Sequence, residues 1–127
     1  MSHTAVQTSS APAAIGPYSQ AVQAGGMLYV SGQIPIDPAT GELAGAEIQT
    51  QVRRSLENLK AILNAAGVGL DHVVKTTVLL QDMDDFPAMN AVYAEYFSEP
   101  YPARAAFQAA KLPRGALVEI EAVAELG

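Results

Sequence analysis

Hydrophobic and polar residues alternate over two short stretches near the start of the chain. Gln20–Ala24 and Met27–Gln33 both show this period of two, and Gly25-Gly26 separates them. Two glycines supply the positive φ angles that a tight hairpin turn needs, so the pattern predicts two paired β-strands. On the second strand, alternation places one set of side chains on one face and the other set on the opposite face. These sets are Met27, Tyr29, Ser31 and Gln33, and Leu28, Val30 and Gly32.

A helical period follows the hairpin. Apolar residues recur every three or four positions from Glu47 to Ala66, which predicts an amphipathic helix that ends at Gly67. Val73–Leu80, rich in Val, Thr and Leu, predicts a strand buried on much of both faces. A second helix is predicted after Asp82–Asp85, whose carboxylates are suited to capping its start.

The last third of the chain predicts two more strands. These are Ala103–Ala110 and Ala116–Glu125, with a turn at Leu112–Gly115. The order of elements predicts an α+β fold, in which a mixed β-sheet has two helices packed on one face. Every gap is short enough for a single domain over residues 1–127, in which residues 2–14 form a loose N-terminal arm because they lack periodicity.

The final strand has an ambiguous face. Val118, Ile120 and Ala122 alternate with Glu119 and Glu121, so the two carboxylates share the sheet face opposite the helices with apolar neighbours. Such a face is too apolar to leave in water and too charged for the core of one chain. Association of these faces in a closed homo-oligomer would cover them. The alternative is an exposed antiparallel face with ordinary surface glutamates.

Composition narrows the function further. The 127 residues carry a net charge of −6 and contain no cysteine, which excludes disulfides, thiolate metal sites and thiol nucleophiles. The acidic balance, without a basic patch, argues against nucleic-acid binding. The sequence has no apolar run long enough to cross a membrane and no signal-peptide pattern, so the expected location is cytoplasmic.

Few residues are candidates for chemistry. With only His3 and His72, a histidine metal cluster or a Ser-His-Asp triad is nearly excluded. Arg104 lies among Ala and Phe residues, where its guanidinium can hold a carboxylate ligand with two hydrogen bonds or pair with Glu119 or Glu121 on another strand. Both interpretations stay open. A glutamate on a partly dry face can have a raised pKa and act near neutral pH.

Short motifs in order along the chain resemble the Rid/YjgF family, in its reactive intermediate/imine deaminase A branch. They cover nearly the whole chain from Ala13 onward, and it is their joint occurrence that is specific. The motifs are Gly16–Ala21, Tyr29–Pro35, Lys75–Val78, Asn90–Tyr93, Pro102–Arg104 and Leu112-Pro113 leading into Val118–Ala122. The resemblance implies a chorismate-mutase-like α+β domain assembled as a homotrimer, with ligand clefts between subunits.

The resemblance also implies a reaction and its residues. The reaction is hydrolysis of enamine/imine intermediates (2-aminoacrylate/2-iminopropanoate and 2-iminobutanoate) to 2-oxo acids and ammonia, without a cofactor or a metal. By this resemblance Arg104 clamps the substrate carboxylate and Glu119 positions or protonates the attacking water. The other residues that it assigns to the cleft are Tyr18, Ser31, Gly32 and Asn90. One departure is Ala106, where many members carry a cysteine, but the mechanism uses no thiol.

Two other functions compete with this one. The same cleft could sense a 2-oxo acid without turnover, as a non-enzymatic binding or regulatory module. An endoribonuclease or translation inhibitor is also conceivable, because such activity is attributed to some relatives of the family. The acidic charge, the lack of a basic stripe and the lack of a histidine pair all argue against RNA cleavage.

Overall fold

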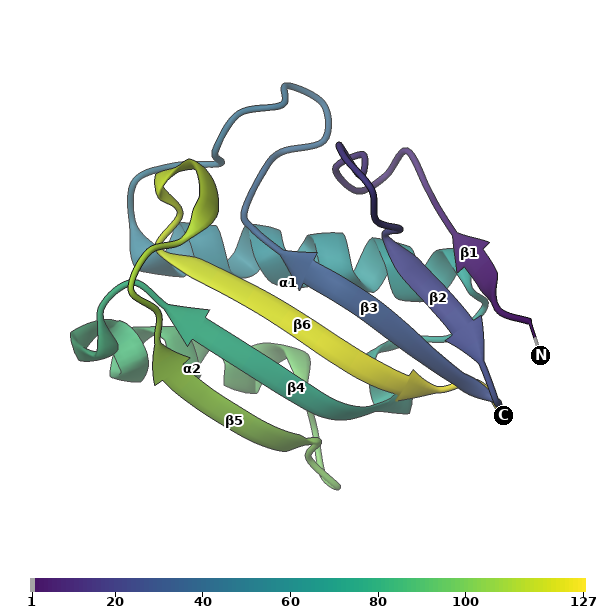
Figure 1. The fold of residues 1–127 in the computed structure, drawn as a ribbon. Coiled ribbons are helices and arrows are strands. Elements are labelled where there is room, and N and C mark those ends of the chain that lie inside the picture. The colour runs from purple at the N-terminus through teal and green to yellow at the C-terminus, as the bar shows by residue number, and fades with distance from the viewer. Residues whose placement is uncertain (1) are drawn as a thin grey trace.

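The computed structural model describes residues 2–127 as one six-stranded mixed sheet with two helices against one face (Figure 1). The strand order is β1-β2-β3-β6-β4-β5, and only the β4–β5 pair is parallel. This confirms the predicted α+β class. The elements are β1 (Thr4–Val6), β2 (Ala21–Ala24), β3 (Met27–Gln33), α1 (Ile48–Ala65), β4 (Val73–Leu80), α2 (Phe86–Tyr96), β5 (Ala103–Gln108) and β6 (Val118–Glu125). Short 3₁₀ turns lie at Leu70–His72, Met83–Asp85 and Pro113–Gly115.

The hairpin and the long helix form where the sequence predicted them. Gly25 and Gly26 have φ angles of 59° and 78°, which only glycine adopts readily, and they join β2 to β3. Helix α1 packs its apolar stripe on the sheet and ends before Gly67, whose φ is 86°. The core between these layers consists of fully buried side chains, among them Leu28, Val52, Leu56, Leu59, Ile62, Leu63, Val78, Leu80, Met89, Val92, Val118 and Ile120.

A bulge near the end of β3 corrects the predicted strand faces. Val30 pairs with Ala122 and Gln33 with Ile120, so three steps on β3 match two on β6. Gln33 therefore shares the buried face with Val30, and the prediction that it lies beside Tyr29 was wrong. The extra residue is accommodated at Ser31 and Gly32, which are two of the predicted site residues.

The N-terminal segment is ordered, in contrast to the predicted loose arm. β1 pairs with β2, and the buried side chain of Gln20 holds the residues that follow β1. Its carboxamide accepts a hydrogen bond from the Thr8 N–H at 2.7 Å and donates to the carbonyls of Thr8 and Pro12 at 3.0 and 2.8 Å. The Gln20 side chain thus supplies the hydrogen bonds that strand pairing would otherwise give this segment. The hydrophobic periodicity of the sequence cannot reveal such a contact.

Nothing in residues 2–127 covers the face of the sheet opposite the helices (Figure 1). Tyr29 and Phe107 are about half exposed there, at 49% and 51%. The prediction that β4 is buried on much of both faces was therefore wrong for the single chain, since Val74 is 41% exposed while Val78 and Leu80 are fully buried. None of the helices in residues 2–127 combines the length and the apolar character that crossing a bilayer requires.

Candidate functional site

One group of predicted site residues lies where β3 and β6 run side by side. Glu119, on β6, is so close to Gly32 on β3 that a Cβ atom built on the glycine would collide with its carboxylate. The absence of a side chain at Gly32 is thus what leaves room for the Glu119 carboxylate. Two residues that the resemblance assigns separately to the cleft are therefore in direct contact.

Burial sets the electrostatics of Glu119. Its carboxylate is half-buried on the open face, and loss of solvation raises its pKa above the ordinary range for glutamate. The negative charge of Glu121, two residues along the strand, adds a smaller contribution in the same direction. A carboxyl group in this state exchanges protons closer to neutrality than an ordinary surface glutamate, which suits it to acid–base work.

Tyr18 and Ser31 belong to the same region but have different roles. The Tyr18 side chain is 54% exposed on the segment before β2. The Ser31 hydroxyl donates to the Ser19 carbonyl at 2.6 Å, so its proton is committed to holding that segment. Ser31 can therefore offer a ligand only its oxygen lone pairs, whereas the Tyr18 hydroxyl has both a donor and an acceptor to offer.

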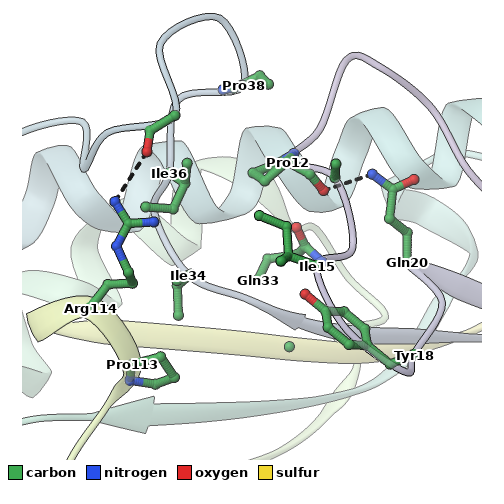
Figure 2. A pocket seen from close by; sticks show the side chains of 13 residues that line it. Pro12, Ile15, Tyr18, Gln20, Gln33, Ile34, Ile36, Pro38, Pro113 and Arg114 are labelled. Carbon is green, nitrogen blue, oxygen red and sulfur yellow. Dashed lines mark hydrogen bonds between the residues drawn. The ribbon is translucent and has the colours of Figure 1, made fainter.

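A pocket of about 610 Å³ opens beside these residues (Figure 2). Tyr18 and Gly32 line it, and Arg114 lies at the end opposite Tyr18. Its walls come from the N-terminal segment, the loop after β3 and the turn before β6. The complete lining is Pro12, Ala13, Ile15, Tyr18, Gln20, Gly32, Gln33, Ile34, Ile36, Pro38, Gly41, Pro113 and Arg114. Most of these side chains are apolar, as is usual for pockets that bind small molecules.

Arg104 and Asn90 form a second group, at the β5 edge of the sheet. The Arg104 Nη1 atom donates to Asn90 Oδ1 at 2.7 Å. Its guanidinium carbon lies 4.7 Å from the centroid of the Tyr93 ring and 5.3 Å from that of Phe86, within the range of cation–π attraction. The Arg104 side chain is exposed, so its remaining N–H donors are accessible to a ligand.

The aromatic support below Arg104 is anchored in the core. The Tyr93 and Thr76 hydroxyls share a buried hydrogen bond of 2.8 Å. Burial raises the pKa of Tyr93, and the Thr76 hydrogen bond and the charge of Arg104 oppose that shift. Tyr93 thus stays a neutral phenol near neutrality and presents its ring face to the cation.

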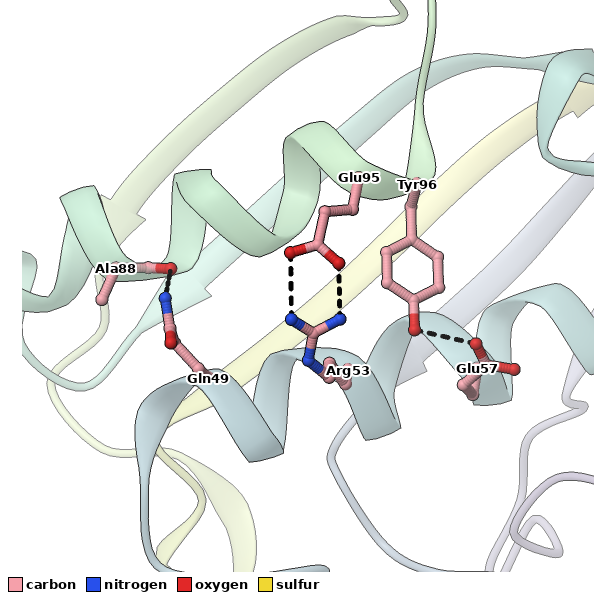
Figure 3. Close-up of polar contacts among 6 residues, drawn as sticks. All are labelled: Gln49, Arg53, Glu57, Ala88, Glu95 and Tyr96. Atoms are coloured by element: carbon pink, nitrogen blue, oxygen red, sulfur yellow. Dashed lines mark hydrogen bonds and ion pairs between the residues drawn. The ribbon is translucent and has the colours of Figure 1, made fainter.

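Side-chain contacts between the helices hold α2, and with it Asn90 and Tyr93, in place (Figure 3). Arg53 on α1 forms a two-pronged ion pair with Glu95 on α2, at 2.7 and 2.9 Å. The Tyr96 hydroxyl donates to Glu57 at 2.8 Å, and Gln49 donates to the Ala88 carbonyl at 3.1 Å. The ion pair lowers the pKa of Glu95.

The two groups lie on opposite faces of the sheet. In the strand register, Arg104 lies opposite Thr76, and Thr76 lies opposite the buried Ala122. Residues opposite one another share a face of the sheet, so the Arg104 side chain points to the helix side. Glu119 pairs with Leu79 in the same row as Phe107, on the open side. Residues 2–127 contain a single ion pair, Arg53–Glu95, so the predicted alternative of an Arg104 pair with Glu119 or Glu121 within one chain was wrong.

Sequence reasoning missed Arg114. Its place in a Pro-Arg-Gly turn gave no signal of a pocket, yet its guanidinium lines one and donates to the Gly41 carbonyl at 3.1 Å. The acidic residues before α2 have a capping role, since Asp82 accepts the Asp84 N–H at 2.8 Å and caps the turn before this helix. Among residues 2–127, no three acidic or histidine side chains gather as metal ligands.

Comparison with known proteins gives consistent results across nearly the whole chain. A family model described as "Endoribonuclease L-PSP" matches residues 8–126. The chain is 57% identical to "RutC family protein PH0854" of Pyrococcus horikoshii over 117 residues, which are 92% of this chain and 93% of that protein. It is 52% identical to the Mus musculus protein named "2-iminobutanoate/2-iminopropanoate deaminase" over 122 residues, 96% of this chain and 90% of that protein. Among solved structures, "E. coli TdcF with bound serine" matches with a TM-score of 0.91 and 46% identity, covering 96% of this chain and 98% of that one.

Proposed function

Because this chain belongs to the Rid/YjgF family, whose model is described as Endoribonuclease L-PSP, we propose that it hydrolyses 2-imino acids such as 2-iminopropanoate and 2-iminobutanoate. The observation that carries the proposal is the exposed Arg104 guanidinium. Asn90 and the Tyr93 ring orient it, and its other N–H groups are accessible to a ligand. That arrangement suits a carboxylate, which every 2-imino acid has. The mouse relative named as a deaminase for these two imines supports the choice, and the bound serine of the E. coli relative is itself an α-carboxylate compound.

The site that we propose lies between protomers. Arg104 and Glu119 face opposite sides of one sheet, so they can act on one small molecule only if the β5 edge of one protomer covers the open face of another. The half-exposed Tyr29 and Phe107 on that face would be buried in the same contact. A homotrimer, as the family resemblance implies, would supply three such clefts.

In this proposal the reaction needs only water. The carboxylate binds Arg104, which leaves the C=N carbon near Glu119 and Tyr18. Glu119 positions the water and exchanges its proton, the oxygen bonds to the imine carbon, and the nitrogen gains the proton. The carbinolamine hydroxyl then passes its proton through Glu119 to the amino group, and the carbon–nitrogen bond breaks, which releases ammonia and the 2-oxo acid. An enamine first takes a proton on its β-carbon and loses one from its nitrogen to become the imine. Orientation and charge complementarity supply the rate, without a cofactor or a metal.

Each remaining residue has a proposed part in the cleft. Gly32 leaves space for Glu119, and Ser31 holds the Tyr18 segment while its oxygen accepts from a bound water or imine N–H. Asn90 orients the Arg104 guanidinium through the 2.7 Å hydrogen bond. Tyr18 offers a hydroxyl to the substrate nitrogen or to the water.

The test generates 2-iminopropanoate in situ with a pyridoxal-phosphate-dependent dehydratase and follows 2-oxo acid release. The protein should accelerate release, and Arg104→Ala should lower kcat/KM about a hundredfold, because about 3 kcal/mol is a typical loss when a charged hydrogen-bond partner is removed. Lys60→Ala, which removes an exposed cation from α1 without touching the contacts between the helices, is the matched control and should leave the rate unchanged.

The hydrolysis assay, combined with binding and RNA cleavage measurements, separates this function from the alternatives. Calorimetric binding of 2-oxobutanoate without acceleration would instead identify a non-enzymatic binding module. RNA cleavage is disfavoured by the net charge of −6, because affinity for a phosphate backbone comes from clustered cations. Cleavage of RNA that survives stringent purification and disappears in Arg104→Ala would reverse that judgement.

A further inference from the structure

Arg114 has an unusual backbone conformation. Its φ and ψ angles are 61° and 16°, and it is the one non-glycine residue with positive φ among residues 2–127. This left-handed region is unfavourable for arginine, and glycine and asparagine are the residues that commonly adopt it. Strain of this kind often marks a functional position, and the Arg114 guanidinium lies in the pocket wall opposite Tyr18 (Figure 2).

The pocket is much larger than the proposed small substrates need. A space of about 610 Å³ is in the range that holds ligands of drug size, whereas 2-iminopropanoate has only a handful of non-hydrogen atoms. The pocket is continuous with the proposed reaction site because Gly32, which contacts Glu119, and Tyr18 line it. From these residues the lining continues past the apolar side chains of Ile34 and Pro113 to Arg114 (Figure 2).

The far end of the pocket is suited to an anion. The only hydrogen bond of the Arg114 side chain within residues 2–127 uses one Nη2 hydrogen, donated to the Gly41 carbonyl. No carboxylate of the described chain pairs with this guanidinium. A guanidinium has five N–H donors, so several remain for a ligand, and a carboxylate can accept two of them at once.

We propose that Arg114 and this pocket form a side-chain subsite for 2-imino acids that carry a second, distal carboxylate. The α-carboxylate would bind Arg104, the methylene chain would follow the apolar walls, and the distal carboxylate would bind Arg114. The subsite deepens the proposed function and rests on it. It assigns Arg114 a role in substrate specificity, not in the hydrolysis itself.

The test compares two imines, each generated in situ by an amino-acid oxidase, one from alanine and one from glutamate. Arg114→Asn removes the cation and suits the left-handed backbone, so it should fold normally. We expect it to lower kcat/KM for the glutamate-derived imine about tenfold and to leave that for the alanine-derived imine within about twofold, and Arg114→Lys should retain part of the difference. Lys111→Gln is the control, because it removes the same charge from an exposed residue outside the pocket. Equal effects of Arg114→Asn on both imines, or none, would overturn the proposal.

A binding measurement keeps the subsite distinct from the reaction. Calorimetry with the two stable 2-oxo acids, 2-oxoglutarate and pyruvate, requires no turnover. If the wild-type protein hydrolyses no imine but binds 2-oxoglutarate through Arg114, the proposed function fails and the subsite stands. If it hydrolyses 2-iminopropanoate but binds 2-oxoglutarate equally well in the wild-type protein and Arg114→Asn, the subsite fails alone.

Discussion

The guanidinium carbon of Arg104 lies 4.7 Å from the centroid of the Tyr93 ring, and this contact joins the edge of the sheet to helix α2. Tyr93 is itself fixed by the buried 2.8 Å hydrogen bond to Thr76. The ring covers one face of the guanidinium, and Asn90 binds one of its nitrogens. Arg104 is thus presented with a set orientation although its side chain is exposed, which lowers the entropy lost when a carboxylate binds.

This contact predicts different effects for two substitutions of Tyr93. Tyr93→Leu removes the ring, and we expect kcat/KM for 2-iminopropanoate to fall several-fold, in line with the ~0.5–2 kcal/mol of a cation–π contact. Tyr93→Phe keeps the ring but leaves Thr76 without its partner, so it should lose about 1 kcal/mol of stability and little activity. Steady-state kinetics and urea unfolding measure the two effects. Equal kinetics in both variants would contradict a positioning role for the ring.

The close approach of Gly32 to Glu119 predicts that even one methyl group harms the site. In Gly32→Ala the Cβ atom would displace the Glu119 carboxylate, and we expect kcat/KM to fall about a hundredfold, the typical effect of a 1 Å misplacement. Gly26→Ala is the matched control, because its Cβ would contact nothing while its φ of 78° penalises a side chain. That control should lose stability in urea unfolding but keep its specific activity.

Sequence periodicity predicted what is long and regular, and missed what depends on distant contacts. The predicted long helix, Glu47–Ala66, agrees with the 18-residue α1 to within one residue at each end. The agreement is close because its apolar positions repeat over many turns. The face on which Arg104 lies was not predictable, since β5 is a mostly exposed edge strand with three alanines and no alternation. The bulge at Ser31 and Gly32 depends on pairing with β6, about ninety residues away along the chain, and Arg114 enters the pocket only because its turn meets the loop at Gly41.

The raised pKa of Glu119 predicts how stability depends on pH. Because the folded protein binds this proton more tightly than the unfolded chain, the stabilisation from Glu119 is complete below the ordinary glutamate pKa and is lost as pH rises through the folded-state pKa. Glu119→Gln cannot ionise, so it should be more stable than the wild-type protein near neutrality, and the difference should vanish on acidification. Urea unfolding across that range measures it. Glu121→Gln, which removes only the smaller cause, should move the transition part of the way, and a constant difference at every pH would contradict the assignment.

The open face of the sheet gives the last prediction, which concerns assembly. Phe107 is 51% exposed in the same row as Glu119, so a protomer that covers this face would bury both. Phe107→Glu places a charge in that contact, and we expect the proposed trimer to dissociate and imine hydrolysis to be lost, while the fold of each protomer persists. Thr50→Glu, at an exposed position in the first turn of α1 on the other side of the sheet, is the control and should change neither property. Light scattering measures the mass and circular dichroism the fold; a Phe107→Glu monomer with full activity would show that the site is complete within one chain.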